Sequence, residues 1–152
     1  MQKFHFKLQP LLNKERIYED ECVGRLRVIQ DTFLNEKNKL ENLKKSRLAS
    51  QNELNAKKKQ EIIPEELRTY ECFFLKLDSR INAGNSRIQE VSKELNTVQD
   101  ELIKIVKKRK ALEKLRDKWE EENKSYLAFM SNKEMDDIAM TKFINKLVTE
   151  ND

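Results

Sequence analysis

The sequence predicts an all-α fold in which two long helices form an antiparallel coiled-coil hairpin, with the C-terminal helix the longer. Apolar side chains recur in steps of three and four residues along most of the chain, and one proline interrupts them near the middle. The 152 residues include only two glycines, too few for the turns of a multi-stranded sheet. A charged fraction of 38% with few aromatic residues is typical of long helices or of disorder, and the periodicity decides for helices.

We expect the first helix to cover about residues 11–59. Pro10 can be accommodated in a first helical turn and marks where this helix can begin. The apolar stripe of this helix, which we call its seam, has five polar intrusions and consists of Leu8, Leu12, Glu15, Glu19, Cys22, Leu26, Ile29, Phe33, Glu36, Leu40, Leu43, Arg47, Ser50 and Leu54.

A turn over about residues 60–64 follows, because Pro64 lacks the N–H group that a helix interior requires. We expect the second helix over about residues 65–147. Its seam is apolar or aromatic at eleven of the twelve positions Leu67, Tyr70, Phe74, Leu77, Ile81, Gly84, Ile88, Val91, Leu95, Val98, Leu102 and Ile105. The repeat stays in phase to Leu147, and a 3.5-residue period held over this length indicates a coiled coil. We therefore expect residues 1–152 to form a single coiled-coil domain.

If the two seams pack together as a hairpin, residues whose numbers add to about 124 face each other. The facing pairs then include Gly84 with Leu40 and Glu15 with Arg109, whereas a register one heptad longer would give Arg47 and Arg116 as the partners. In either register, Glu15, a charged residue at a seam position, faces an arginine. The sequence leaves the choice between the two registers open, because burying such a pair often costs about what it returns.

About thirty C-terminal residues must project past the first helix or fold back, since the second helix is the longer. The charge also changes sign there: residues 1–118 carry 27 basic and 19 acidic residues, and residues 119–152 carry 4 and 8. Apolar residues of this segment include Trp119, Tyr126, Phe129, Met130, Ile138, Met140 and Phe143. An exposed helix that carries so many apolar side chains usually has a partner.

Chemically reactive groups are sparse. His5 has no Cys, Asp or Glu at metal-ligand spacing, two cysteines give neither a zinc site nor a disulfide framework, and no glycine-rich loop could cradle a phosphate. We expect Cys22 to be a seam residue and Cys72 to be exposed, both as reduced thiols. The sequence therefore predicts no enzyme, no cofactor, no metal and no small-molecule substrate.

The longest apolar run has four residues, against the ~20 that a membrane-spanning helix requires, and no apolar leader follows the N-terminal lysine. We therefore expect a cytoplasmic protein. The basic cluster over residues 104–118 could neutralise phosphates. It contains no base-stacking aromatic residue and is interrupted by Glu113 and Asp117. A solvated face or an electrostatic patch for a protein is favoured, so nucleic acid is not an expected partner, and a nucleic-acid-binding helical hairpin is the least favoured alternative.

Both ends of the chain carry motifs with a known counterpart. The run Phe4-His5-Phe6-Lys7-Leu8-Gln9-Pro10-Leu11-Leu12, followed by Arg16 and Glu19, resembles the opening of the FliJ family of flagellar export proteins. The runs Lys110 to Lys118 and Lys133 to Ala139, with Phe143, are similar to that family's C-terminal signature. The aromatic Trp119 departs from the polar stretch expected there.

This resemblance implies a component of the flagellar type III export apparatus at the cytoplasmic side of the cell membrane. FliJ-like proteins are similar to the central stalk of rotary ATPases. They bind and activate a hexameric export ATPase, contact the membrane-embedded export gate, and are linked to export chaperones. By analogy, the ATPase contact is expected at Phe4, Phe6, Leu11, Arg109, Leu112, Arg116 and Trp119, and the gate contact at Leu43, Tyr70, Phe73 and Leu77.

Two alternatives stay open from the residues themselves. The seams could pair between chains, which would make the protein a generic coiled-coil tether or dimerising scaffold. The same stalk-like architecture would also serve the injectisome counterpart of the flagellar system, although the terminal motifs resemble the flagellar proteins. Phe73, which lies off the seam, could either contact a partner or pack on the isoleucines of the turn.

Overall fold

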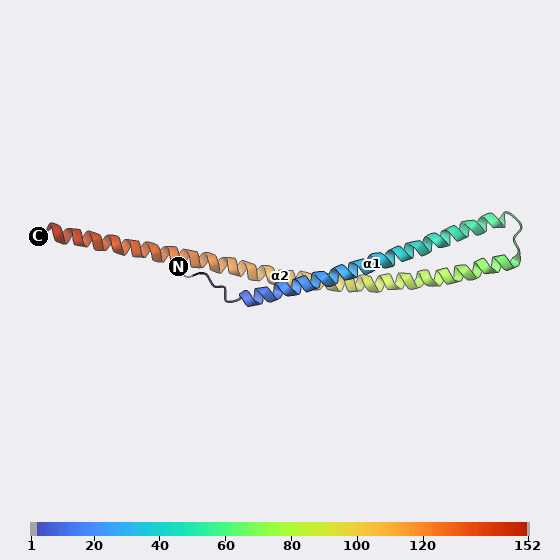
Figure 1. Cartoon of the computed structure of the whole chain (residues 1–152), viewed down its shortest axis with the longest axis horizontal. Coiled ribbons are helices and arrows are strands. Elements are labelled where there is room, and N and C mark those ends of the chain that lie inside the picture. The colour runs from blue at the N-terminus through green and yellow to red at the C-terminus, as the bar shows by residue number, and fades with distance from the viewer. Residues whose placement is uncertain (1–2, 152) are drawn as a thin grey trace. The chain divides into compact units, whose positions relative to one another are not determined.

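The computed structural model describes residues 3–151 as two helices, α1 (Gln9–Lys58) and α2 (Pro64–Glu150), joined by a short connection (Figure 1). The helices contain 50 and 87 residues. No strand occurs within the described residues, and the all-α class is confirmed. The predicted single domain includes residues 1–2 and 152, which lie outside the described residues.

The helix ends differ from the predicted bounds by one to three residues. α1 begins at Gln9, whose N–H donates to the carbonyl of Phe6 at 3.0 Å, so Pro10 lies in the first turn, where its missing N–H breaks no helical bond. α2 begins at Pro64 itself for the same reason, and the N–H of Leu67 donates to the carbonyl of Ile63 at 3.2 Å. α2 continues to Glu150, three residues beyond the predicted end.

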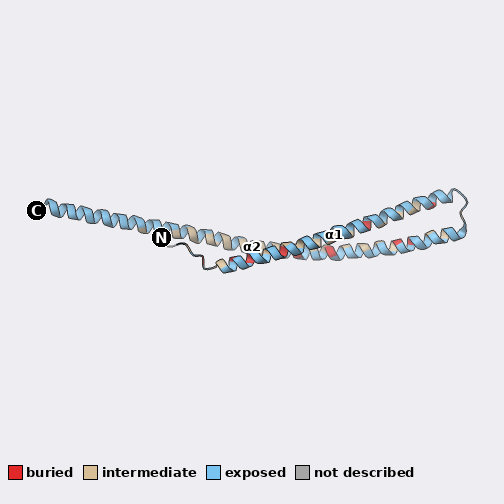
Figure 2. Ribbon diagram, in the orientation of Figure 1, coloured by how far each residue is buried: buried red, intermediate tan, exposed pale blue. Residues whose placement is uncertain are grey.

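The chain divides into two compact units, and both helices contribute to each. One unit is Tyr18–Lys104, and the other combines Met1–Ile17 with Ile105–Asp152. In Tyr18–Lys104, the buried apolar side chains all occupy predicted seam positions, and they are Cys22, Leu40, Leu54, Phe74, Leu77, Val91 and Val98. The periodicity of the sequence thus identified the buried face of both helices in this unit (Figure 2).

Three contacts give the relative direction of α1 and α2 within Tyr18–Lys104. Cys22 contacts the Val98 carbonyl, Leu40 lies against Gly84, and Arg47 bonds to Asp78. Residue numbers fall along α2 as they rise along α1, so the two segments run in opposite directions within this unit.

The contact at Gly84 distinguishes between the two predicted partners of this glycine. A Cβ atom at Gly84 would lie 3.1 Å from Cδ1 of Leu40, so Leu40, and not Arg47, approaches the glycine. The Sγ atom of Cys22 lies 3.7 Å from the carbonyl oxygen of Val98, one turn before the predicted neighbour Leu102. A helix carbonyl points toward the residue four positions later, so Cys22 lies level with the turn between Val98 and Leu102.

The polar intrusion at Arg47 is satisfied by two groups on α2. Its Nε donates to Asp78 at 2.6 Å, and its guanidinium lies 4.5 Å from the ring centre of Phe74. Cys22 is buried and Cys72 is exposed, both as free thiols, as predicted. Across the described residues, neither helix has the length and apolar content to cross a membrane.

Candidate functional site

The N-terminal segment is held against α2 by an aromatic contact. Phe6 and Trp119 meet edge to face, with ring centroids 5.3 Å apart and planes at 70°. Phe6 is only 4% exposed, and Leu12, one turn into α1, is fully buried. Of the residues expected to contact an ATPase, Phe6 and Trp119 are thus brought together, and Leu11 is 43% exposed. We call Phe4, Phe6, Leu11, Arg109, Leu112, Arg116 and Trp119 the terminal cluster.

A charged network lies next to this aromatic contact. Arg109 donates to both carboxylate oxygens of Glu113 at 3.0 Å, and the Nη2 atom of Arg16 lies 3.5 Å from one of them. The hydrogen bond from Arg109 lowers the pKa of Glu113, and Arg16 adds to the effect. Glu113 therefore joins the N-terminal part of α1 to α2 within this unit.

The sequence prediction for this network was incomplete. Glu15 is buried on the seam, Arg109 bonds to Glu113, and Arg116 lies near Asp117, so the predicted facing of Glu15 with Arg109 or Arg116 stays a prediction. Glu113 had been noted only as an interruption of a basic run. The available signal was its spacing of four residues from Arg109, which places the two side chains on one helix face.

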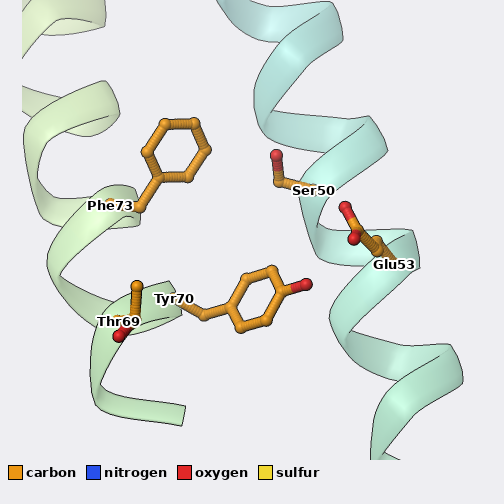
Figure 3. A pocket seen from close by; sticks show the side chains of 5 residues that line it. All are labelled: Ser50, Glu53, Thr69, Tyr70 and Phe73. Atoms are coloured by element: carbon orange, nitrogen blue, oxygen red, sulfur yellow. The ribbon is translucent and has the colours of Figure 1, made fainter. Parts of the chain in front are cut away.

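A second candidate surface lies in Tyr18–Lys104 near the connection between the helices. Tyr70 and Phe73 of α2 point toward α1, and with Thr69 they line a hollow whose other wall is formed by Ser50 and Glu53 (Figure 3). The Phe73 ring is 42% exposed, and a second hollow lies on its other side, against Arg68, Cys72 and Lys76. Phe73 thus stands as an apolar ridge between two depressions.

The other residues expected at an export gate are less accessible. Leu77 is 4% exposed and belongs to the core, and Leu43 and Tyr70 are half-buried. The ammonium group of Lys57 lies 5.2 Å from the centre of the Tyr70 ring, and hydrogen bonding to the Tyr70 hydroxyl raises the pKa of Lys57. We call Leu43, Tyr70, Phe73 and Leu77 the tip cluster.

The third surface is the C-terminal arm, by which we mean residues 120–150 of α2. Every residue from 131 to 150 is exposed, and the arm is almost uniformly pale blue in Figure 2. Its exposed large apolar residues are Tyr126, Leu127, Phe129, Met135, Ile138, Met140, Phe143, Ile144, Leu147 and Val148. Within the described part of the chain, no group of three potential ligands is placed to hold a metal ion.

The model of one protein family, that of the flagellar FliJ protein, matches residues 4–147. The chain belongs to the FliJ family. The match extends over nearly all of both helices and includes both terminal motifs that suggested the family. No curated protein and no solved structure matches the chain.

Membership in the FliJ family makes this chain a component of the flagellar export apparatus that interacts with other export components. The family is non-catalytic, which fits the lack of catalytic motifs in the sequence. The terminal cluster, the tip cluster and the C-terminal arm are therefore considered as surfaces for protein partners.

Proposed function

We propose that this FliJ-family chain is a non-enzymatic stalk of the flagellar type III export apparatus. In this proposal the whole chain forms an antiparallel coiled coil, its terminal end binds and activates the hexameric export ATPase, and its tip contacts the export gate membrane protein. The observation that carries the proposal is the family match over residues 4–147. It is supported by the buried seam of α1 and α2 within Tyr18–Lys104, which is the packing expected of a two-helix coiled coil.

The terminal cluster is suited to bind the ATPase ring because it combines the N-terminal segment with residues 109–119 of α2. Phe6 packs on Trp119, and Glu113 accepts from Arg109 and Arg16, so the N-terminal segment and α2 present one surface in this unit. In our proposal Phe6 and Trp119 shape this surface from beneath, and exposed Leu11 contacts the ATPase directly.

Turnover of the export ATPase from the same organism tests this contact. Adding the purified chain should raise the rate of ATP hydrolysis and favour hexamer assembly. Leu11→Asp should weaken the stimulation roughly fivefold or more, the factor that corresponds to about 1 kcal/mol of lost contact. The matched control is Leu48→Asp, another exposed leucine of α1, which should stimulate normally. An ATPase that responds in neither rate nor assembly to the unaltered chain would contradict the proposal.

The gate contact is assigned to the ridge formed by Phe73. An aromatic side chain that is 42% exposed between two hollows offers apolar area and shape that a partner can enclose. Binding of the soluble part of the gate protein should therefore fall for Phe73→Ala and persist for Leu75→Ala, although Leu75 is the more exposed of the two. Equal losses for both variants would show that the ridge has no special role.

Contacts with export chaperones, and a position in the cytoplasm at the membrane face of the flagellar base, complete the proposal. The alternative of a scaffold whose first helices pair between chains is disfavoured, because α2 of the same chain already covers the seam of α1 at Cys22, Leu40 and Arg47. Co-sedimentation of the chain with membranes that hold the export gate, compared with membranes that lack it, tests the location.

A further inference from the structure

The C-terminal arm carries an apolar face that no other described residue covers from residue 131 onward. The seam continues into the arm as Asn123, Tyr126, Met130, Lys133, Asp137, Met140, Ile144 and Leu147. Phe129, Phe143 and Val148 lie beside this stripe and widen it, since they are three or four residues from its members. From residue 131 onward every position of this face is exposed. A helix face with this pattern is typical of one helix of a coiled coil whose partner helix is missing.

Only two positions of this stripe are charged, and their charges are opposite, while the third polar position, Asn123, is uncharged. Lys133 and Asp137 stand next to each other at its centre, with Met130 before them and Met140 after them. Neither takes part in an ion pair among the described residues. A pair within the helix would also have the less favourable order, because an acid is better placed four residues before a base than after it.

From Tyr126 to Ile144 the stripe therefore has the order apolar, methionine, base, acid, methionine, apolar. Two copies of such a stripe are complementary when they run in opposite directions. Lys133 of each copy then faces Asp137 of the other, Met130 faces Met140, and Tyr126 faces Ile144. A parallel pair would instead set lysine against lysine and aspartate against aspartate, which repel each other.

The length of the arm gives the same register independently. The facing residues of the charge-matched pair have numbers that add to 270, so the two-fold axis passes through position 135. The arm covers residues 120–150, and its midpoint is also 135. The end of one arm would thus reach residue 120 of the other and stop short of Trp119, which Phe6 already covers. Charge and available length therefore agree on one arrangement.

We propose that the C-terminal arm is a dimerisation surface, on which a second copy of this chain packs as an antiparallel coiled coil centred on position 135. Phe129 of one copy lies beside Phe143 of the other at the flank of this pair, where an aromatic contact adds to the apolar area. This interaction goes beyond the proposed stalk function, because it requires neither the ATPase nor the gate.

Sedimentation equilibrium of the full chain over a range of concentrations tests whether the dimer exists. The chain should associate reversibly to a dimer, and removal of the central charge match should weaken association. In Lys133→Asp the facing residues are aspartates, and in Asp137→Lys they are lysines. Each variant alone should dimerise at least about tenfold more weakly, which corresponds to about 1.4 kcal/mol. A chain that stays monomeric at every concentration would overturn the proposal.

Mixing the two variants is the decisive experiment. A heterodimer of Lys133→Asp with Asp137→Lys restores both opposite-charge pairs, so the mixture should associate as strongly as the unaltered chain. The control is Lys142→Asp, which makes the same charge change on the opposite face of the arm and should leave association unchanged. Helix content by circular dichroism shows whether each variant remains folded. A dimer that is insensitive to the two single changes, or a mixture that fails to recover, would place the contact elsewhere.

Disulfide trapping tests the direction of the arms. In a background with Cys72→Ser, which removes the exposed thiol, Met130→Cys and Met140→Cys are prepared as separate chains. Their mixture should form a mixed disulfide under mild oxidation, because these positions face each other in the proposed pair. Each chain alone should form little. Rapid cross-linking of Met130→Cys with itself would indicate a parallel pair and refute the arrangement.

Discussion

Two glycines in helix interiors provide a direct test of how α1 packs on α2 within Tyr18–Lys104. Gly24 has nothing within 4 Å of the position that a Cβ atom would take. At Gly84 the same atom would lie 3.1 Å from Cδ1 of Leu40, and 3.9 and 4.0 Å from its Cβ and Cγ. Gly24→Ala and Gly84→Ala add the same methyl group. The two substitutions therefore differ only in the atoms that surround this new methyl group.

The expected free-energy changes follow from these distances. Replacing glycine by alanine in a helix interior stabilises by about 1 kcal/mol through propensity alone, and Gly24→Ala should show this full gain. At Gly84 the new carbon is closer to Leu40 than the roughly 3.5–4.0 Å of an ordinary carbon contact. Leu40 is buried, so its methyl group must shift against its neighbours. Overpacking of about 1 kcal/mol should cancel most of the gain, and Gly84→Ala should stabilise by less than about 0.5 kcal/mol.

Urea unfolding followed by circular dichroism measures both variants, and both glycines lie in the same unit, so the two changes report on the same packing. Larger side chains should widen the difference, with Gly84→Leu destabilising by about 1–3 kcal/mol and Gly24→Leu remaining neutral or stabilising. In a Leu40→Ala background, Gly84→Ala should recover the full propensity gain. Equal gains at the two glycines in the unaltered background would refute the close approach of Leu40 to Gly84.

Three further perturbations test individual contacts. Arg47→Met should lower the free energy of unfolding by about 1 kcal/mol through loss of the bond to Asp78, and a double-mutant cycle with Asp78→Asn should show a coupling that independent sites would lack. Because the pKa of Glu113 is lowered, its carboxylate stabilises the folded chain at pH values above its ordinary pKa of 4.5, and this contribution is lost as the pH falls through the lowered value. In thermal unfolding, Glu113→Gln should therefore lose less stability on acidification than the unaltered chain. Parallel stability-against-pH profiles for the two chains would contradict the network. Phe6→Ala should shift the emission of Trp119, the sole tryptophan, to longer wavelength, and an unchanged spectrum would argue against their contact.

The buried face of each helix was predictable because buried residues recur in steps of three and four along the sequence of that one helix. The α2 residues that are buried, such as Phe74 and Val91, are seam positions separated by steps of three and four. Knowledge of the other helix is not needed to find them. The same local information located the helix ends to within three residues, since Pro10 and Pro64 can each stand only in a first turn.

Partners of charged side chains were less predictable, because they depend on the flanks of a helix and not on its seam. Glu15 was expected to face Arg109, and the sequence pattern did not indicate that Arg109 bonds to Glu113 on its own helix. A side chain as long as arginine can reach partners on the same helix or on the neighbouring one. The choice between them depends on distances of a few ångströms, which a repeat pattern does not specify. The pairing of Arg47 with Asp78 escaped prediction for the same reason.

The C-terminal arm shows what a hydrophobic repeat does and does not encode. Its stripe keeps the phase that runs through Val91 and Val98, yet those two residues are buried by α1, whereas Met140 and Ile144 are exposed. The repeat therefore specifies a face that can pair, and the presence of a second helix decides whether it does. A face that only had to remain solvated would have no reason to keep apolar residues in phase as far as Leu147. The opposite charges at Lys133 and Asp137 then determine which second helix fits, and the helix that satisfies them in reverse order is a copy of the arm itself.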